Sequence, residues 1–228
     1  MESKLFIPKK GISIDYGESK IYTFNGSIYK EFKDNISQAT RRRKKERLKY
    51  LQQFEYLKRY YPEIEYFVEC LFGLYIKGYV MKEIETKSIN SYSIPTEKRL
   101  ILLKQIRKIL KMFNDIGLRY YDIHLDNIRC TKSNRPIFFD IDSILFSDDK
   151  KPDIKPYGFD YYECLGGNLD SNFQRLKFNV FIKEALSTCQ ELKFDEIGQE
   201  MMNYQLNKYS PHSIFAHEDL LEHVLIKK

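Results

Sequence analysis

Acidic and amide side chains gather in one stretch of the sequence, YYDIHLDNIRCTKSNRPIFFDID, which runs from residue 120 to residue 142. Asp122 is followed five residues later by Asn127, and Asp140 comes thirteen residues after Asn127, at the end of an apolar run. A carboxylate can orient a hydroxyl and accept its proton, and carboxylate and amide oxygens are ligands that suit Mg²⁺. The stretch therefore carries the groups that phosphoryl transfer from a nucleotide requires.

Asp and Asn are also common in turns, so Asp126 and Asn127 can be read simply as residues that shape a loop. The spacing nevertheless resembles the protein-kinase-like superfamily. Its catalytic loop reads D-x-x-x-x-N, and its metal-binding strand end reads D-F-G or, in atypical members, D-x-D. Residues 122–127 (DIHLDN) match the loop, and residues 140–142 (DID) match the strand end. The resemblance implies that Asp122 is the catalytic base, that Asn127 and Asp140 bind Mg²⁺, and that Asp142 is an auxiliary metal ligand.

The loop departs from the pattern of ordinary protein kinases. It begins Tyr120-Tyr121-Asp122 in place of His-Arg-Asp, and no A-P-E motif follows Asp142. His124 stands where those enzymes carry lysine, which is similar to aminoglycoside and choline phosphotransferases and to various bacterial kinase-like proteins. The resemblance implies that His124 contacts the γ-phosphate or the acceptor. The alternative is a neutral, hydrogen-bonded structural histidine.

The N-terminal part of the chain has the pattern of a small sheet with one helix. The strongest turn signal is Asn25-Gly26, which predicts a hairpin with strands over residues 20–24 and 27–32. The pattern then predicts a long helix over residues 35–61, which Pro62 stops. Two further strands are expected over 64–72 and 75–84, with Gly73 near the turn between them.

In the resemblance, a strand lysine contacts the nucleotide phosphates and a helix glutamate holds that lysine. Lys30, on the second arm of the hairpin, and Glu46 take these roles. Glu46 is chosen because it falls about 40° from an apolar helical stripe. The members of that stripe are Tyr50, Phe54, Leu57 and Tyr61. Glu55 is the alternative glutamate, and the plain reading is an exposed strand lysine with a glutamate paired on its own helix.

The resemblance also implies contacts to the rest of the nucleotide. The only glycine of the expected phosphate loop is Gly17, so the phosphates would be bound by backbone groups near Gly17 and Ser19. Met81 would lie behind adenine, and the backbone of Lys82, Glu83 and Ile84 would form the hinge. Met81 can equally be an ordinary core residue.

The second part of the chain changes to helical spacing. Apolar residues from 102 to 113 recur with a helical period before Gly117. Two short strands are expected over 128–131 and 136–141, followed by a polar loop over 147–168 and two or three helices. We therefore predict an α+β chain with a two-lobed protein-kinase-like fold. Its parts are a small β-rich N-lobe with one long helix, residues 1–84, and a mostly helical C-lobe, residues 85–228, which together form one kinase-like domain.

Composition limits the other classes of protein. With 228 residues, 43% hydrophobic and 31% charged, the chain has a soluble, globular balance. No apolar run reaches the length of about 18 residues that a membrane helix needs, and the N-terminus lacks the apolar core of a signal peptide. Four widely separated cysteines without a C-x-x-C spacing predict reduced thiols and a cytoplasmic location.

Charge and histidine spacing point to no further site. The basic segment 41–49 is read as a solvated helix face, with an anionic partner as the alternative. The net charge of +6 is mild, so nucleic acid is not expected as a partner. His212, His217 and His223 lack metal-ligand spacing on a helix, and no metal is assigned to them.

These expectations define one main hypothesis and two rivals. The main one is a kinase-like transfer of the γ-phosphate of MgATP to a hydroxyl on a protein Ser/Thr or on a small molecule. The sequence leaves the acceptor open, because the 86 residues after Asp142 give limited room for a helical substrate insert. The rivals are a pseudokinase that binds a nucleotide or a protein, and a nucleic-acid-binding regulator that uses the basic helix.

Overall fold

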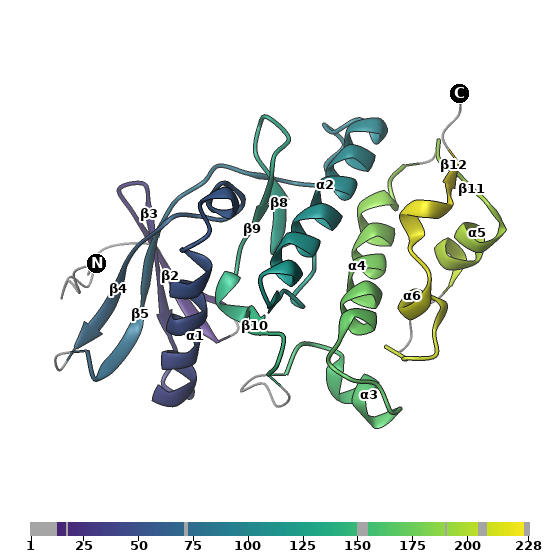
Figure 1. Cartoon of the computed structure of the whole chain (residues 1–228). Helices are drawn as coiled ribbons and strands as arrows, with labels where there is room; N and C mark the ends of the chain where they lie inside the picture. The colour runs from purple at the N-terminus through teal and green to yellow at the C-terminus, as the bar shows by residue number, and fades with distance from the viewer. Residues whose placement is uncertain are drawn as a thin grey trace. The chain divides into compact units, whose positions relative to one another are not determined.

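The computed structural model describes residues 13–16, 18–70, 73–149, 155–189, 191–204 and 209–225. The chain divides into two compact units, Met1–Glu85 and Thr86–Lys228. Both units combine helices and strands, so the chain is α+β, as the sequence predicts (Figure 1).

The first unit is a five-stranded antiparallel sheet with one α-helix, α1, packed against β5 (Figure 1). The strand order is β1-β2-β3-β5-β4. Its elements are β1 (Ser13–Tyr16), β2 (Ser19–Phe24), β3 (Ser27–Phe32), α1 (Gln38–Leu51), the 3-10 helix η1 (Glu55–Tyr60), β4 (Ile64–Cys70) and β5 (Tyr75–Lys82).

The predicted Asn-Gly hairpin is confirmed and sets the register of this sheet. Asn25 and Gly26 both have positive φ, 45° and 77°, as a tight two-residue turn requires. Lys30 is opposite Tyr79 in the ladder between β3 and β5. A Cβ on the neighbouring Gly78 would lie 2.0 Å from the carbonyl oxygen of Lys30, so only glycine allows the two strands to pair here.

The predicted helix over residues 35–61 is wrong in its second half. α1 ends at Leu51, and residues 55–60 form the separate 3-10 helix η1. The apolar stripe that was assumed to run from Tyr50 to Tyr61 therefore does not lie on one helix. The buried residues of α1 are Arg41, Lys44, Arg47, Leu48 and Leu51.

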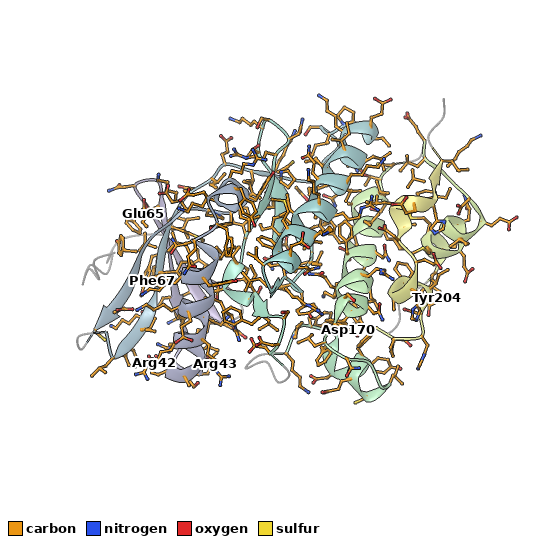
Figure 2. The ribbon with its side chains drawn as sticks, in the orientation of Figure 1. Arg42, Arg43, Glu65, Phe67, Asp170 and Tyr204 are labelled. Carbon is orange, nitrogen blue, oxygen red and sulfur yellow. The ribbon has the colours of Figure 1, made fainter. Side chains whose placement is uncertain are left out.

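The basic segment 41–49 is only partly a solvated face. The Arg41 guanidinium is buried and donates to the backbone carbonyls of Ile36, Ile76 and Lys33 at 2.8–2.9 Å. Arg42 and Arg43 are exposed and lie together on α1 (Figure 2). Because three of its cations are buried, the segment offers a smaller cationic surface than its sequence suggests.

The second unit has two long helices, α2 and α4, which pack side by side (Figure 1). Its helices are α2 (Thr96–Asp115), η2 (Ile141–Ser143), α3 (Phe159–Cys164), α4 (Ser171–Leu186), α5 (Glu196–Asn203), α6 (Ile214–His217) and η3 (Leu220–His223). Its strands are β6 (Lys87–Ser88), β7 (Leu118–Arg119), β8 (Ile128–Cys130), β9 (Pro136–Phe138), β10 (Leu145–Phe146), β11 (Lys193–Phe194) and β12 (Val224–Leu225). They form the three small antiparallel sheets β6-β8-β9, β10-β7 and β11-β12.

The helix predicted before Gly117 and the β8–β9 hairpin are confirmed, but two other expectations for the second unit are wrong. The second strand of the hairpin ends at Phe138, three residues earlier than predicted, because Asp140 adopts a left-handed backbone conformation. The loop predicted over 147–168 contains α3. Among the described residues, no helix has the length and apolarity needed to cross a membrane.

The C-terminal segment is held to α4 by a buried asparagine. Asn179 is fully buried, and its Nδ2 donates to the carbonyls of Phe215 at 2.9 Å and Glu218 at 2.6 Å. Its Oδ1 accepts from the amide of Leu220 at 3.0 Å. One side chain therefore satisfies three backbone groups of the segment that includes α6 and η3.

Asn179→Ala should lower the free energy of unfolding by about 3 kcal/mol, because it leaves buried backbone groups without partners. Asn203→Ala is the matched control, since Asn203 is exposed at the end of α5. Urea denaturation of the two variants checks this. Equal stabilities would show that Asn179 does not hold the segment.

His223 makes the same region sensitive to pH. Its Nδ1 lies 2.9 Å from Asp195 Oδ2, and its Nε2 lies 3.5 Å from Glu218 Oε2. Burial lowers the pKa of His223, but the hydrogen bonds to these two carboxylates and their charges outweigh burial and raise it above its usual 6.5. The protonated histidine therefore stabilises the folded state.

The stability that His223 contributes should be fully present below about pH 6.5 and should be lost as the pH rises through its raised pKa. Urea midpoints measured across this range should fall for the wild type and for His212→Gln, an exposed control. The fall should be smaller for His223→Gln. An unchanged pH dependence in that variant would contradict the assignment.

Candidate functional site

The loop between β7 and β8 holds Asp122 and Asn127 against each other. Asn127 is buried, and its Nδ2 donates to Asp122 Oδ2 at 2.7 Å and to the Asp122 carbonyl at 3.3 Å. The amides of Asn127 and Ile128 both donate to the carbonyl of His124, which closes the turn between them. Asn127 therefore shapes the loop and also fixes the Asp122 carboxylate, whereas its role as a Mg²⁺ ligand stays a prediction.

The β8–β9 hairpin brings Asp140 to the same place. Ile128 pairs with Phe138, and the amide of Phe139 donates to the carbonyl of Asn127 at 2.7 Å. The hydroxyl of Tyr120 donates to the carbonyl of Phe139, also at 2.7 Å. Asp140 is the next residue in the chain, so Asp122, Asn127 and Asp140 belong to one hydrogen-bonded assembly.

Asp140 has an unusual backbone. Its φ and ψ are 51° and 38°, in the left-handed region that costs a non-glycine residue about 1 kcal/mol. The Ser143 hydroxyl and amide both donate to its carbonyl, at 2.7 and 3.0 Å, and hold the turn. Asp140 is partly exposed, whereas Asp142 is only 1% exposed. Asp140 is therefore the better placed of the two to meet a ligand.

The expected ligands have the oxygen chemistry that suits Mg²⁺. Asn127 uses its Nδ2 towards Asp122, which leaves Oδ1 as the amide's acceptor for a cation. Within the described ranges, no three His, Cys, Asp or Glu side chains are grouped to hold a metal. Two carboxylates and one amide are the donor set that Mg²⁺ uses when nucleotide phosphates and water supply its remaining ligands.

His124 lies between two carboxylates. Its Nε2 is 3.6 Å from Asp122 Oδ1, its Nδ1 is 3.8 Å from Asp126 Oδ2, and its side chain is 33% exposed. Burial raises the pKa of Asp122, but the hydrogen bond and charge of His124, the charge of Lys177 and the Asn127 hydrogen bond together lower it. His124 thus faces Asp122 and is not packed in the core.

Helix α4 contributes residues that the sequence reasoning missed. Gln174 donates to the carbonyl of Tyr120 at 3.1 Å and accepts from Asn114 at 2.7 Å. Lys177, one turn later, acts on Asp122 through its charge. The available signal was the polar residues Gln174, Lys177 and Asn179, which interrupt the apolar spacing between Phe173 and Ile182.

Asp170 is the N-cap residue of α4. Its Oδ1 accepts from the amides of Asn172 and Phe173 at 2.8 and 3.1 Å, and it lies at the first turn of the helix (Figure 2). Gln174 makes the contact from α4 to the backbone of the loop that contains Asp122.

The structure describes most of the residues that were predicted to contact the nucleotide in the first unit. Lys30 is buried on β3, and Met81 is buried on β5 opposite Ile28. Ser19, on β2, has a buried hydroxyl without a hydrogen-bond partner among the described residues. Gly17 lies outside the described residues.

Two backbone donors of the expected hinge are already used. The amide of Lys82 donates to Glu63 at 2.9 Å, and the amide of Glu83 donates to Gly26 at 2.8 Å. A nucleotide base would therefore depend on the amide of Ile84 or on the carbonyls of this segment. The hinge roles of Lys82, Glu83 and Ile84 stay predictions with this restriction.

The prediction that Glu46 lies beside a buried stripe of α1 is wrong. Glu46 is exposed, roughly 160° around the helix from the centre of the buried face, and Glu55 is exposed on η1. The predicted ion pair joins a lysine of the sheet to a glutamate of the helix. In the structure the helix supplies the lysines, and the glutamates come from outside the helix. Lys44 lies 3.4 Å from Glu18, and Lys45 pairs with the buried Glu69 on β4.

No protein-family model matches this chain, and no curated protein sequence matches it. The geometry of the described residues is therefore the basis on which a function can be inferred.

The left-handed conformation of Asp140 predicts an order of stability for two variants that both lack the carboxylate. Asp140→Gly should be about 1 kcal/mol more stable than Asp140→Ala, because glycine adopts positive φ without steric cost. Urea denaturation of the pair measures this difference. Equal stabilities, or a more stable alanine variant, would show that residue 140 is not left-handed.

Proposed function

We propose that the chain is an ATP-dependent, kinase-like phosphotransferase that moves the γ-phosphate of MgATP to a hydroxyl. The observation that best supports this is the hydrogen bond from Asn127 to the Asp122 carboxylate, together with the backbone hydrogen bond from Phe139, the residue before Asp140, to Asn127. The fold that belongs to this proposal is the two-lobed protein-kinase-like fold, with the five-stranded sheet in its small lobe and α2 and α4 in its large lobe.

Asp122 acts on the acceptor. Its carboxylate accepts a hydrogen bond from the acceptor hydroxyl, and the hydroxyl oxygen attacks the γ-phosphorus. The new bond joins that oxygen to phosphorus, the bond from the γ-phosphorus to the β,γ-bridging oxygen breaks, and ADP leaves with the electron pair. The hydroxyl proton passes to Asp122 and then to solvent. Asn127 contributes by keeping the carboxylate in one orientation.

The remaining residues bind the phosphates. Asn127 Oδ1 and Asp140 would hold Mg²⁺, which neutralises charge on the phosphates when bound, and Asp142 is the auxiliary ligand. Lys30 would contact the α- and β-phosphates, and the unpartnered Ser19 hydroxyl is available to donate to a phosphate oxygen. His124, beside Asp122, would contact the γ-phosphate or the acceptor.

The acceptor class remains open between a protein Ser/Thr and a small molecule. A cytoplasmic location belongs to the same proposal, because ATP and reduced thiols occur together there. The four cysteines are free thiols in the structure, in agreement with a reducing compartment.

A pseudokinase is the second candidate function. It is favoured by the engaged amides of Lys82 and Glu83 and by the exposure of Glu46, which both weaken the expected nucleotide contacts. The nucleic-acid reading loses support, because Arg41, Lys44 and Arg47 are buried.

Turnover of γ-labelled ATP with Mg²⁺ should fall at least about a hundredfold in Asp122→Asn. Asp126→Asn is the matched control, because this exposed aspartate lies in the same loop and has no role in the proposed chemistry. It should retain activity within about threefold. Circular dichroism of both variants should match the wild type.

Transfer of label to an added protein that is lost in Asp122→Asn would identify a protein kinase. Slow ATP hydrolysis without labelling of protein, also lost in Asp122→Asn, would point to a small-molecule acceptor. Full activity in Asp122→Asn would contradict the proposed site. No turnover in the wild type, together with a thermal shift on adding ATP, would leave the pseudokinase.

A further inference from the structure

One face of the sheet in the first unit carries polar groups beside its apolar residues. Ser19 on β2 is directly opposite Phe32 on β3, and Lys30 lies two residues before Phe32 on the same strand. Opposite residues, and residues two apart along a strand, point to the same face, so Ser19, Lys30 and Phe32 share one face. Ser19 is 2% exposed and Lys30 is 8% exposed. A hydroxyl and an ammonium are thus kept at this face although their burial costs free energy.

Helix α1 adds a second ammonium to the same face. Lys44 is 5% exposed, and its Nζ lies 5.9 Å from the centre of the Phe32 ring. Because Phe32 is opposite Ser19 and two residues from Lys30, the Lys44 ammonium reaches the part of the sheet that carries both groups. The protein-kinase-like pattern places a helix carboxylate beside the strand lysine, whereas the buried helix residue here is a cation. Two cations on one face favour an anion as their partner.

The structure pairs Lys44 with a carboxylate that can be exchanged. The Lys44 Nζ lies 3.4 Å from Glu18 Oε2, and the Glu18 side chain is 37% exposed. The backbone of Glu18 is held separately, because its carbonyl accepts from the amide of Lys33 at 2.9 Å. The carboxylate can therefore turn into solvent while the backbone contact stays in place. Its departure would open the Lys44 ammonium to another anion.

The neighbouring Lys45 has the same two kinds of contact, but its partner is fixed. Its Nζ pairs with Glu69 and lies 5.5 Å from the centre of the Phe67 ring. Glu69 is on β4, and its side chain is only 7% exposed. A buried carboxylate that loses its cation is strongly destabilising, so an incoming anion cannot replace Glu69 at low cost. Lys44 and Lys45 therefore differ in whether their partner can be exchanged.

We propose that Lys44 is a phosphate-binding residue and that Glu18 is its exchangeable counter-ion, which the phosphate chain of a nucleotide displaces. This role rests on the proposed function, because it concerns the phosphates of the nucleotide that Lys30 would contact. Lys44 donates to a phosphate oxygen in place of Glu18. The Ser19 hydroxyl, which has no hydrogen-bond partner among the described residues, donates to another oxygen. One carboxylate leaves Lys44 and one phosphate oxygen takes its place, so the buried ammonium keeps an anionic partner throughout.

The test is calorimetric titration of the full chain with MgATP and, separately, with tripolyphosphate, which has the phosphate chain but no base. Lys44→Met should weaken the binding of both ligands at least about tenfold, because a charge-assisted hydrogen bond is lost. Lys45→Met is the matched control and should stay within about twofold of the wild type, because Glu69 is not exchanged. Glu18→Gln should bind both ligands about threefold more tightly, because no carboxylate competes for Lys44. Circular dichroism checks that each variant is folded, and Gln replaces Met in a lysine variant that is not.

The sign of the Glu18 effect separates ligand binding from a purely structural ion pair. A pair that only attaches α1 to the residue before β2 would give Glu18→Gln the wild-type affinity or a lower one, and that result would overturn the inference. Equal affinities of the folded Lys44 and Lys45 variants would also overturn it, as would a wild type that binds neither ligand.

The titration also distinguishes this inference from the proposed function. Binding that depends on Lys44, in a wild type without turnover, would refute the phosphotransferase and support the phosphate-binding role. Turnover in the wild type, with an affinity for MgATP that is unchanged in Lys44→Met, would overturn the role of Lys44 alone.

Discussion

The hydrogen bond from the Phe139 amide to the Asn127 carbonyl ties the two acidic segments of the chain together. The ladder that it extends is only three residues long on each strand, from Ile128 to Cys130 and from Pro136 to Phe138. Because side chains alternate along a strand, a slip of one residue would turn the strand ends to opposite faces and separate Asn127 from Asp140. The hydrogen bond from the Tyr120 hydroxyl to the carbonyl of Phe139 opposes such a slip. The Tyr120 ring also packs edge-on against the Phe138 ring, with ring centroids 5.3 Å apart. The core thus maintains the spacing of the site.

Buried cations recur in this protein, and two buried arginines bind backbone carbonyls in the same way. Arg41 is the fourth residue of α1, and Arg99 is the fourth residue of α2. Each guanidinium donates to carbonyls five and eight residues earlier and to one distant carbonyl, Ile76 for Arg41 and Ala185 for Arg99. The same device therefore attaches the start of a long helix to its preceding loop in both units. A planar group with five donors suits this task in a way that lysine does not. Lys177 is also buried, and its ammonium has one carbonyl contact, to Tyr157 at 3.4 Å.

Sequence alone predicted the parts of the fold that local rules govern. The turn at Asn25-Gly26 requires positive φ, and the apolar spacing in α2 has a helical period, so neither depends on distant residues. The prediction of a helix over 35–61 failed because apolar residues after Leu51 keep a helical spacing although they do not lie on one helix. Leu57 and Tyr61 are buried, and Tyr56 is half-exposed. The prediction for Glu46 failed for the same reason, because Glu46 was chosen by its angle to the apolar stripe from Tyr50 to Tyr61. In the candidate site, the residues within one loop and one hairpin were found, whereas Gln174 was missed because only tertiary packing brings α4 to the carbonyl of Tyr120.

Two features around the acidic segments run against what stability alone would select. Asp140 occupies a left-handed conformation that glycine adopts without strain, and Lys177 is a buried ammonium where an apolar residue would match the rest of α4. At Gly26, Gly78 and the Asp170 cap, by contrast, the local choice of residue agrees with the fold. Exceptions of this kind are expected at functional sites, where a side chain is kept for its chemistry. Asp140 follows a strand end that bonds to Asn127, and Asn127 donates to the Asp122 carboxylate, so the strained residue belongs to the same hydrogen-bonded group as Asp122. This position agrees with the catalytic role that we propose for the loop.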